Sequence, residues 1–220
     1  MGVRTSGFTF AHSLALVFAA LGITLYVLSG APERALAARE RAFGGIREGD
    51  LVFQDLACGQ RCSFIRRVTE SRYVHVGLVM IEDGERVVYE AYEPVGPTPL
   101  VAWVGRGVNQ ELAVYRPDDE LLAQLPNARR ELQRMRGRPY DGDYQWDDAR
   151  IYCSELIIKA FAGEGAPPFV TPHTVRLGSL RARVAQQTAG RLTEDTLMVT
   201  PRDLTESPRL TRIVDELLPR

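Results

Sequence analysis

The clearest hydrophobic pattern along the chain is a pair of β-rich runs on either side of Asp83–Gly84. The runs "YVHVGLVMI" and "ERVVYEAY" are rich in β-branched and aromatic residues, which are enriched in strands. An Asp-Gly pair between two such runs is typical of a two-residue hairpin turn. Shorter runs predict three further strands at "GDLVFQDL", "LVAWV" and "ELAVYRP", residues 49–56, 100–104 and 111–117.

Helical periodicity appears on both sides of these strands. Residues 118–135, "DDELLAQLPNARRELQRM", are helical by period with Pro126 as an interruption, and residues 152–163, "YCSELIIKAFAG", predict a helix that ends at Gly163. A short helix is expected at "SFIRRVTES", and the tail from Met198 predicts a strand end followed by a capped helical segment. Strands in the middle with helices around them indicate an α+β fold rather than alternating βαβ units.

The first thirty residues have a different pattern. After Arg4, an apolar run from Leu14 to Leu28 contains no charged residue. A basic start followed by such a run is typical of a segment that inserts into a membrane. Residues 1–37 are therefore expected to be a signal peptide, cleaved after the small residues Ala35–Ala37, or a membrane anchor. A helical linker is expected over 38–48 and a single domain over 49–220, exported to the periplasm or held facing outside the cytoplasm.

Composition narrows the function classes. The 220 residues carry 27 Lys and Arg against 28 Asp and Glu, a net charge of −1, so no nucleic-acid partner is expected. In an exported protein Cys58 and Cys62 of "CGQRC" are candidates for a disulfide, which leaves Cys153 as an odd thiol. A zinc site is not favoured, because the spacing is CxxxC and no second close Cys/His pair completes four ligands. We expect no metal and no organic cofactor.

Cys153 lies at the predicted start of a helix. The first N–H groups of a helix have no partner within it and create positive potential. A thiolate is favoured there, and the same N–H groups can bind an oxyanion. The alternative is a cysteine that only fills the core. The two interpretations differ in whether a base lies within hydrogen-bond reach.

Three histidines are candidates for that base. His12 lies in the export segment, and His173 lies in a proline-flanked loop. His75 lies in the first strand of the hairpin, where the alternative is a core histidine. If Asp83–Gly84 is a two-residue turn, Gly77 pairs with Glu90, and Glu90 shares a face with His75. Glu90 can then orient His75; a three-residue turn would point Glu90 away and leave it a solvent-facing acid.

Seven segments, in this order, carry a resemblance: "GDLVF", "YVHVGLV", "VVYEA", "TPL…W", "GRPYD", "YCSEL" and "TPRDLTESP". Together they resemble the permuted papain-like amidases of the YiiX/YaeF type, relatives of NlpC-type cell-wall peptidases. The resemblance runs from about Gly49 to Pro208 and implies a circularly permuted papain-like (NlpC-type) fold, with an antiparallel sheet packed against the helix that carries the cysteine. In this permuted order the histidine strand precedes the cysteine helix, as His75 precedes Cys153.

The resemblance also implies roles. Cys153 would be the nucleophile, His75 the base and later the acid, and Glu90 the residue that orients His75. Tyr140 of "GRPYD" matches a position near the site, where it lines the substrate pocket or donates to the oxyanion; the alternative is a packing aromatic.

The expected function is a cysteine hydrolase that forms an acyl-enzyme on an amide of a cell-envelope peptide or acylated compound. One alternative is a lipid acyltransferase or thioesterase-like enzyme acting on acyl chains. Another is a non-catalytic binding protein of the same fold. The expected partners are a small-molecule, lipid or peptide substrate and, through the N-terminal segment, a membrane.

Overall fold

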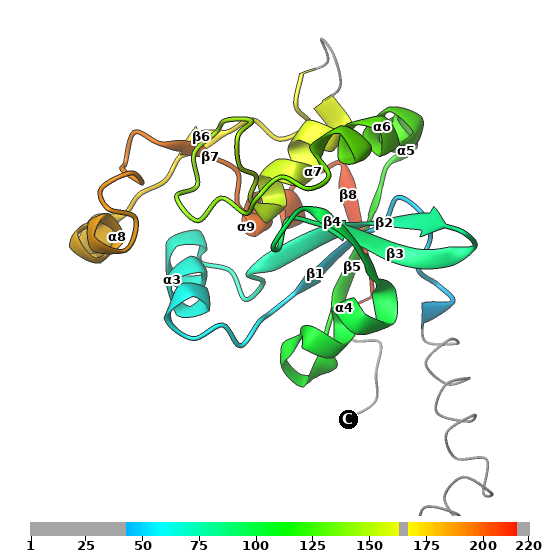
Figure 1. The fold of residues 1–220 in the computed structure, drawn as a ribbon, viewed down its shortest axis with the longest axis horizontal. Coiled ribbons are helices and arrows are strands. Elements are labelled where there is room, and N and C mark those ends of the chain that lie inside the picture. The colour runs from blue at the N-terminus through cyan, green and yellow to red at the C-terminus, as the bar shows by residue number, and fades with distance from the viewer. Residues whose placement is uncertain (1–42, 163–166, 215–220) are drawn as a thin grey trace, which may run out of the picture. The chain divides into compact units, whose positions relative to one another are not determined.

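The computed structural model of the chain describes residues 43–162 and 167–214 (Figure 1). A compact unit begins at Ile46. The predicted signal or anchor segment, residues 1–37, and the predicted helix end at Gly163 lie outside the described residues. Within the described part of the chain, no helix is both long and apolar enough to cross a membrane.

A six-stranded sheet forms the centre of this unit, in the order β4-β3-β2-β1-β5-β8. Every neighbouring pair in it is antiparallel. A separate two-stranded sheet pairs β6 with β7. The strands are β1 Leu51–Gln54, β2 His75–Glu82, β3 Glu85–Glu90, β4 Gly96–Pro99, β5 Ala113–Pro117, β6 His173–Thr174, β7 Leu197–Met198 and β8 Leu210–Val214.

The predicted hairpin is confirmed as β2 and β3. Glu82 pairs with Glu85 and Leu78 with Tyr89, so the turn has two residues. Asp83 and Gly84 both have positive φ, 51° and 82°, as a type I′ turn requires. The register is therefore the one that places Glu90 opposite Gly77.

Helices lie on both sides of the sheet (Figure 1). Leu132 of α6 and Ile157 of α7 share one core with Leu51, Phe53 and Leu78 from the strands. Alternate strand residues face the other side, where α4 packs against β3 and β4. The helices are α3 Gln60–Thr69, α4 Leu100–Arg106, α5 Asp119–Leu122, α6 Leu125–Met135, α7 Cys153–Ala162, α8 Arg181–Gln187 and α9 Pro201–Thr205, with 3₁₀ turns η1 Val108–Gln110 and η2 Gly178–Leu180.

Two predicted elements differ in the structure. The strand predicted at 100–104 is wrong: these residues begin helix α4, and Leu100, Trp103 and Val104 bury one face at helical spacing. A short apolar run does not distinguish the two states by itself. The tail helix α9 is capped by Thr200 as expected, but the residues after it form strand β8 on β5. The helix predicted over 118–135 is interrupted as expected: α5 ends at Leu122 and α6 begins at Leu125, with Pro126 in the first turn of α6.

Candidate active site

Cys153 is the first residue of α7, and the helix start is built around it. The backbone N–H of Tyr152 donates to Glu155 Oε2 at 3.1 Å, and the Ser154 hydroxyl donates to the Val199 carbonyl at 2.7 Å. These bonds fix the first turn against the segment that precedes α9. Cys153 is the free cysteine and is 5% exposed, so its sulfur lies at the inner end of a site rather than on the surface.

Glu155, two residues after Cys153 in the first turn of α7, is an acid with no solvent exposure. Burial raises the pKa of Glu155 to about 8, although Lys159 and the Tyr152 N–H oppose this change. The Lys159 Nζ atom lies 2.8 Å from Glu155 Oε1. Glu155 therefore accepts a hydrogen bond from the backbone N–H at the start of α7. Its carboxyl group is protonated at low pH and pairs with Lys159 once it is ionised.

His75, at the start of β2, lies between the sulfur and a carboxylate. Its Nε2 atom is 2.5 Å from Glu90 Oε2, and strand β2 packs against α7, the helix that carries Cys153. Because Nε2 is occupied by Glu90, Nδ1 is the nitrogen left for the sulfur. Burial by itself would lower the pKa of His75. The interactions with Cys153 and Glu90 outweigh burial and raise the pKa to about 9. At neutral pH the imidazole is thus held as its cation.

Glu90 is 1% exposed and is held by more than the histidine. Its Oε1 atom accepts from the Thr98 hydroxyl at 2.6 Å and from the Arg106 guanidinium. Burial alone would raise the pKa of Glu90, but the bonds from His75 and Thr98 and the charge of Arg106 keep it below its ordinary value. Glu90 is therefore an ionised, fully bonded carboxylate at the bottom of the site.

Aromatic rings enclose the His75 imidazole. The Trp103 ring stacks at 6.1 Å between centroids, and Tyr92 meets the imidazole edge-on at 5.9 Å. Gly77, opposite Glu90, leaves the space that the side chains of β3 occupy, since a Cβ there would lie 2.2 Å from Val88 Cγ1 and 3.6 Å from Glu90 Cβ. The sequence analysis did not predict Thr98, Trp103 and Arg106 as site residues. They lie in β4 and α4, where the apolar pattern predicted a single strand over 100–104.

Tyr140 lies beside both Cys153 and His75. It forms a parallel bridge with Ile151, two residues before Cys153, and it lines the same cavity as Tyr144. Burial raises the pKa of Tyr140 well above its ordinary value, so the hydroxyl stays protonated and can donate. Tyr140 is the one predicted residue that lines the cavities next to both Cys153 and His75.

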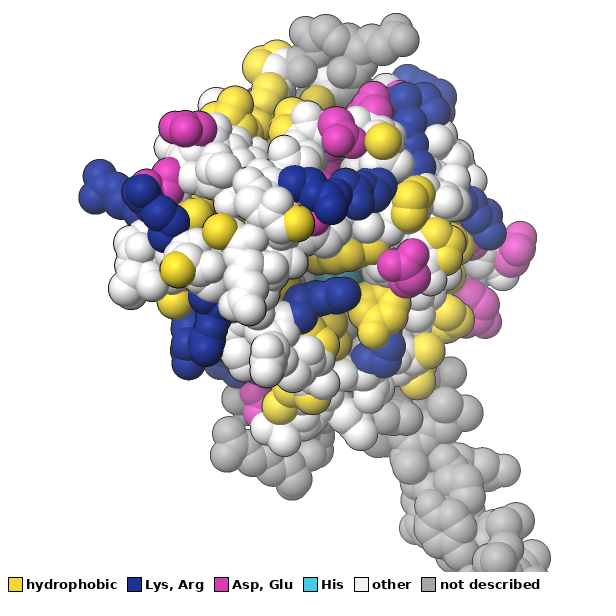
Figure 2. All heavy atoms as spheres, turned by 60° about the vertical axis from the view of Figure 1, so that its left-hand side comes forward, with side chains coloured by type: hydrophobic (Ala, Val, Ile, Leu, Met, Phe, Trp, Pro, Cys, Tyr) yellow, Lys and Arg dark blue, Asp and Glu magenta, His cyan; other side chains and the backbone are white. Residues whose placement is uncertain are grey.

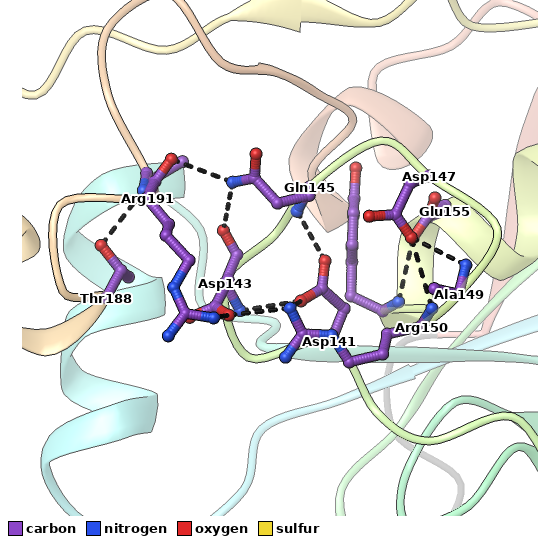
Figure 3. Close-up of polar contacts among 11 residues, drawn as sticks. Asp141, Asp143, Gln145, Asp147, Ala149, Arg150, Glu155, Thr188 and Arg191 are labelled. Carbon is purple, nitrogen blue, oxygen red and sulfur yellow. Dashed lines mark hydrogen bonds and ion pairs between the residues drawn. The ribbon is translucent and has the colours of Figure 1, made fainter.

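The loop that carries Tyr144 is fixed by a polar network (Figure 3). The Asp141 carboxylate has no exposed surface and accepts from the N–H groups of Asp143 and Gln145 at 2.9 and 2.5 Å. Asp143 pairs with Arg150 at 2.9 Å and with Arg191 at 2.5 Å. This network joins the 141–150 loop to the residues after α8 and holds Tyr144 against Tyr140.

Two cavities meet the site, and α3 forms a wall of each. An apolar cavity of ≈ 20 Å³ borders Cys153 and Tyr152, with Phe64, Val74 and Met198 in its walls. A wider cavity of ≈ 240 Å³ has His75 in its wall together with Arg61, Tyr92, Glu93 and Tyr140. Figure 2 shows a hollow with histidine at its floor and with hydrophobic and basic side chains around it.

The remaining predicted site residues are also placed. Cys58 and Cys62 form a disulfide across the start of α3. His173, the alternative base, pairs its Nε2 with Asp203 Oδ1 at 3.0 Å, and its side chain is 49% exposed. It lines neither cavity next to Cys153 and His75. The structure therefore brings together Cys153, His75, Glu90 and Tyr140 and keeps His173 apart from them.

Two known proteins from Escherichia coli are similar to this chain. The chain is 26% identical to the uncharacterized protein YiiX of Escherichia coli K12 over 174 residues, 76% of this chain and 86% of that protein. It also matches a crystal structure described as metalloprotein yiiX from Escherichia coli O157:H7, with a TM-score of 0.70 and 26% identity, over 77% of this chain and 97% of that one.

The description of that crystal structure calls the Escherichia coli protein a metalloprotein. Among the residues described for the present chain, no group of three or more His, Cys, Asp or Glu side chains is placed to hold a metal ion.

A family model described as permuted papain-like amidase enzyme, YaeF/YiiX, C92 family, matches residues 45–214. The match covers both the histidine hairpin and the cysteine helix, and the mixed helix and antiparallel sheet architecture fits it. The chain therefore belongs to the YaeF/YiiX family of permuted papain-like amidases, C92, a cysteine hydrolase class.

Proposed function

We propose that this protein is a cysteine hydrolase in which Cys153, His75 and Glu90 form a catalytic triad that cleaves an amide through an acyl-enzyme. The observation that carries the proposal is the His75 ring, which lies 2.5 Å from the Glu90 carboxylate on a strand packed against the helix that carries Cys153, and whose pKa the Cys153 side chain helps to raise. A nucleophile, a base and a residue that orients the base are the parts that nucleophilic catalysis needs.

The first half of the reaction forms the acyl-enzyme. The Cys153 thiolate attacks the amide carbonyl, and the carbonyl oxygen becomes an oxyanion. Backbone N–H groups at the start of α7 stabilise that charge, and the protonated Tyr140 hydroxyl is a further donor beside the sulfur. His75 gives its proton to the leaving nitrogen, the C–N bond breaks, and the amine departs.

The second half returns the enzyme to its resting state. His75, now neutral, takes a proton from water as the oxygen of that water attacks the thioester. The C–S bond breaks, the acid leaves, and the thiolate and imidazolium pair forms again. Glu90, fixed by Thr98 and Arg106, keeps Nδ1 of His75 aimed at the sulfur throughout.

A second candidate substrate follows from the apolar cavity at Cys153. Its walls are mainly hydrophobic, with Phe64, Val74 and Met198 among them, and such walls favour an acyl group over a charged peptide. Its ≈ 20 Å³ admits about one water-sized group, so an acyl chain would enter only if the cavity widens. The same triad would then remove an acyl group from an acylated compound, or transfer it to an acceptor other than water. A binding protein without turnover is the remaining alternative.

We place the protein outside the cytoplasm, in the cell envelope. The apolar N-terminal run after Arg4 and the Cys58–Cys62 disulfide support this location, because disulfides persist in oxidising compartments. Its partners would be a peptide, lipid or small-molecule substrate and the membrane to which the leader directs it.

The experiment compares peptidoglycan peptides with acylated amines and acylated lipids as substrates of the full chain. Intact-mass spectrometry under acid quench is expected to trap an acyl adduct on Cys153 with one of these classes. Cys153→Ala and His75→Ala should each abolish release of product, whereas His173→Ala should not. Equal product release by wild type and Cys153→Ala would overturn the proposal.

A further inference from the structure

The "CGQRC" segment has no role in the triad, yet it borders the site. Its disulfide closes a short loop that contains Arg61 in the first turn of α3. Cys58, Arg61 and Cys62 all line the ≈ 240 Å³ cavity that has His75 in its wall. Cys62 is 1% exposed, so the disulfide anchors the loop to the core and places the backbone of the exposed residue Arg61 at the edge of the cavity.

The charge of Arg61 is not neutralised by a neighbouring acid. Arg66, on the same helix, pairs with Asp55 at 2.7 Å, whereas no ion pair of Arg61 lies within the part of the chain that the structure describes. Its positive charge acts on the hydroxyls of Tyr140 and Tyr144. The guanidinium is therefore close to the two tyrosines beside the nucleophile, and it is free to bind a ligand.

The cavity also determines which anion fits. Glu93 lines the same cavity, and within the described residues it has no ion pair either. The Glu93 carboxylate repels any anion beside Arg61, and it repels a dianionic phosphate about twice as strongly as a single carboxylate. A planar guanidinium also accepts a carboxylate in bidentate geometry.

We propose that Arg61 is a specificity-determining residue that binds a carboxylate of the substrate, a few bonds from the carbonyl that Cys153 attacks. The inference rests on the proposed function and narrows it: the preferred substrate is an acyl compound or peptide with a free carboxylate near the scissile amide. The disulfide between Cys58 and Cys62 restricts the backbone of the loop that carries Arg61.

Matched alkylating probes test this on the full chain without a known substrate. Iodoacetate and iodoacetamide, and N-iodoacetylglycine and its carboxamide, differ within each pair only in the carboxylate. The readout is the ratio of the two rate constants for alkylation of Cys153. In wild type at least one carboxylate probe should react faster than its amide, and Arg61→Gln should reduce that ratio about fivefold.

The control is Arg67→Gln on the same helix, because Arg67 lines a different cavity from Arg61. It should leave the ratio unchanged, Arg61→Lys should restore part of it, and Glu93→Gln should increase it. A wild-type ratio of one, or equal ratios in wild type and Arg61→Gln, would overturn the role of Arg61 while Cys153 remains reactive. If Cys153 reacts no faster than a free small thiol with any probe, the proposed function itself is overturned, and this inference with it.

Discussion

Glu90 contacts His75 across a β-hairpin, with Oε2 of the acid 2.5 Å from Nε2 of the imidazole. The two residues share a face because the turn at Asp83–Gly84 has two residues. A turn longer by one residue would place the carboxylate on the other face of the sheet. One turn thus determines whether the imidazole is oriented toward the sulfur.

The first prediction concerns the charge of His75. Replacing Glu90 with Gln keeps the shape but removes the negative charge that helps raise the pKa of His75 to about 9. The ring should then lose its proton at lower pH, since a cation next to a neutral amide is stabilised less. NMR titration of the His75 ring in wild type and Glu90→Gln measures this. A midpoint that does not move would mean that Glu90 does not set the protonation of the base.

The second prediction concerns Thr98, which reaches the base only through Glu90. Thr98→Val removes the donor 2.6 Å from Glu90 Oε1 and leaves a buried carboxylate oxygen short of one bond, a loss of about 1–3 kcal/mol. Alkylation of Cys153 at neutral pH should slow, but much less in a Glu90→Gln background. The double-mutant cycle measures this coupling. Additive effects of the two substitutions would show that Thr98 does not act through Glu90.

Gly77 provides the third prediction. In Gly77→Ala the new Cβ would lie 2.2 Å from Val88 Cγ1 and 3.0 Å from the Tyr89 carbonyl oxygen. Overpacking of this kind lowers the free energy of unfolding by about 1–3 kcal/mol. The new methyl group would also lie directly beside Glu90. Urea denaturation should show the loss.

The matched control for that variant is Gly105→Ala in α4, where a Cβ meets nothing within 4 Å. It should be neutral or stabilising by about 0.4–1 kcal/mol. Equal stability of the two variants would contradict the close packing of β2 and β3 at Gly77.

A fourth prediction follows from Glu155, whose pKa burial raises to about 8. An acid with a raised pKa binds more protons in the folded state, so its contribution falls as pH rises from its unfolded value of about 4.3 to 8. Glu155→Gln keeps an acceptor for the Tyr152 N–H but does not titrate. The free energy of unfolding should therefore fall less between pH 5 and pH 8 in Glu155→Gln than in wild type. Parallel curves for the two proteins would exclude this assignment.

Local patterns were sufficient to predict the hairpin and the cysteine at a helix start. The Asp-Gly turn sets a register by itself, and that register predicts which face Glu90 shares. The start of α7 follows from the apolar period after Tyr152. These features depend on residues close together in sequence, which is why they can be derived without a structure. The catalytic roles of Cys153, His75, Glu90 and Tyr140 stay predictions.

Long-range contacts were the part that the sequence did not reveal. Arg106 reaches Glu90 because α4 packs against β3 and β4, and "LVAWV" was interpreted as a strand. Strand β8 pairs with β5 from almost a hundred residues away, so no local pattern marks it. The bond between Asp143 and Arg191 joins two polar loops whose composition fits any solvent-exposed turn.

The most direct test of the triad is the rate at which iodoacetamide alkylates Cys153 near neutral pH. In wild type the rate constant should exceed that of a free small thiol, because the His75 cation and the start of α7 favour the thiolate. His75→Ala should reduce the rate constant by about tenfold or more, and Cys153→Ser should remove the label, whereas His173→Ala should change neither. A Cys153 that reacts equally fast with and without His75 would contradict the account.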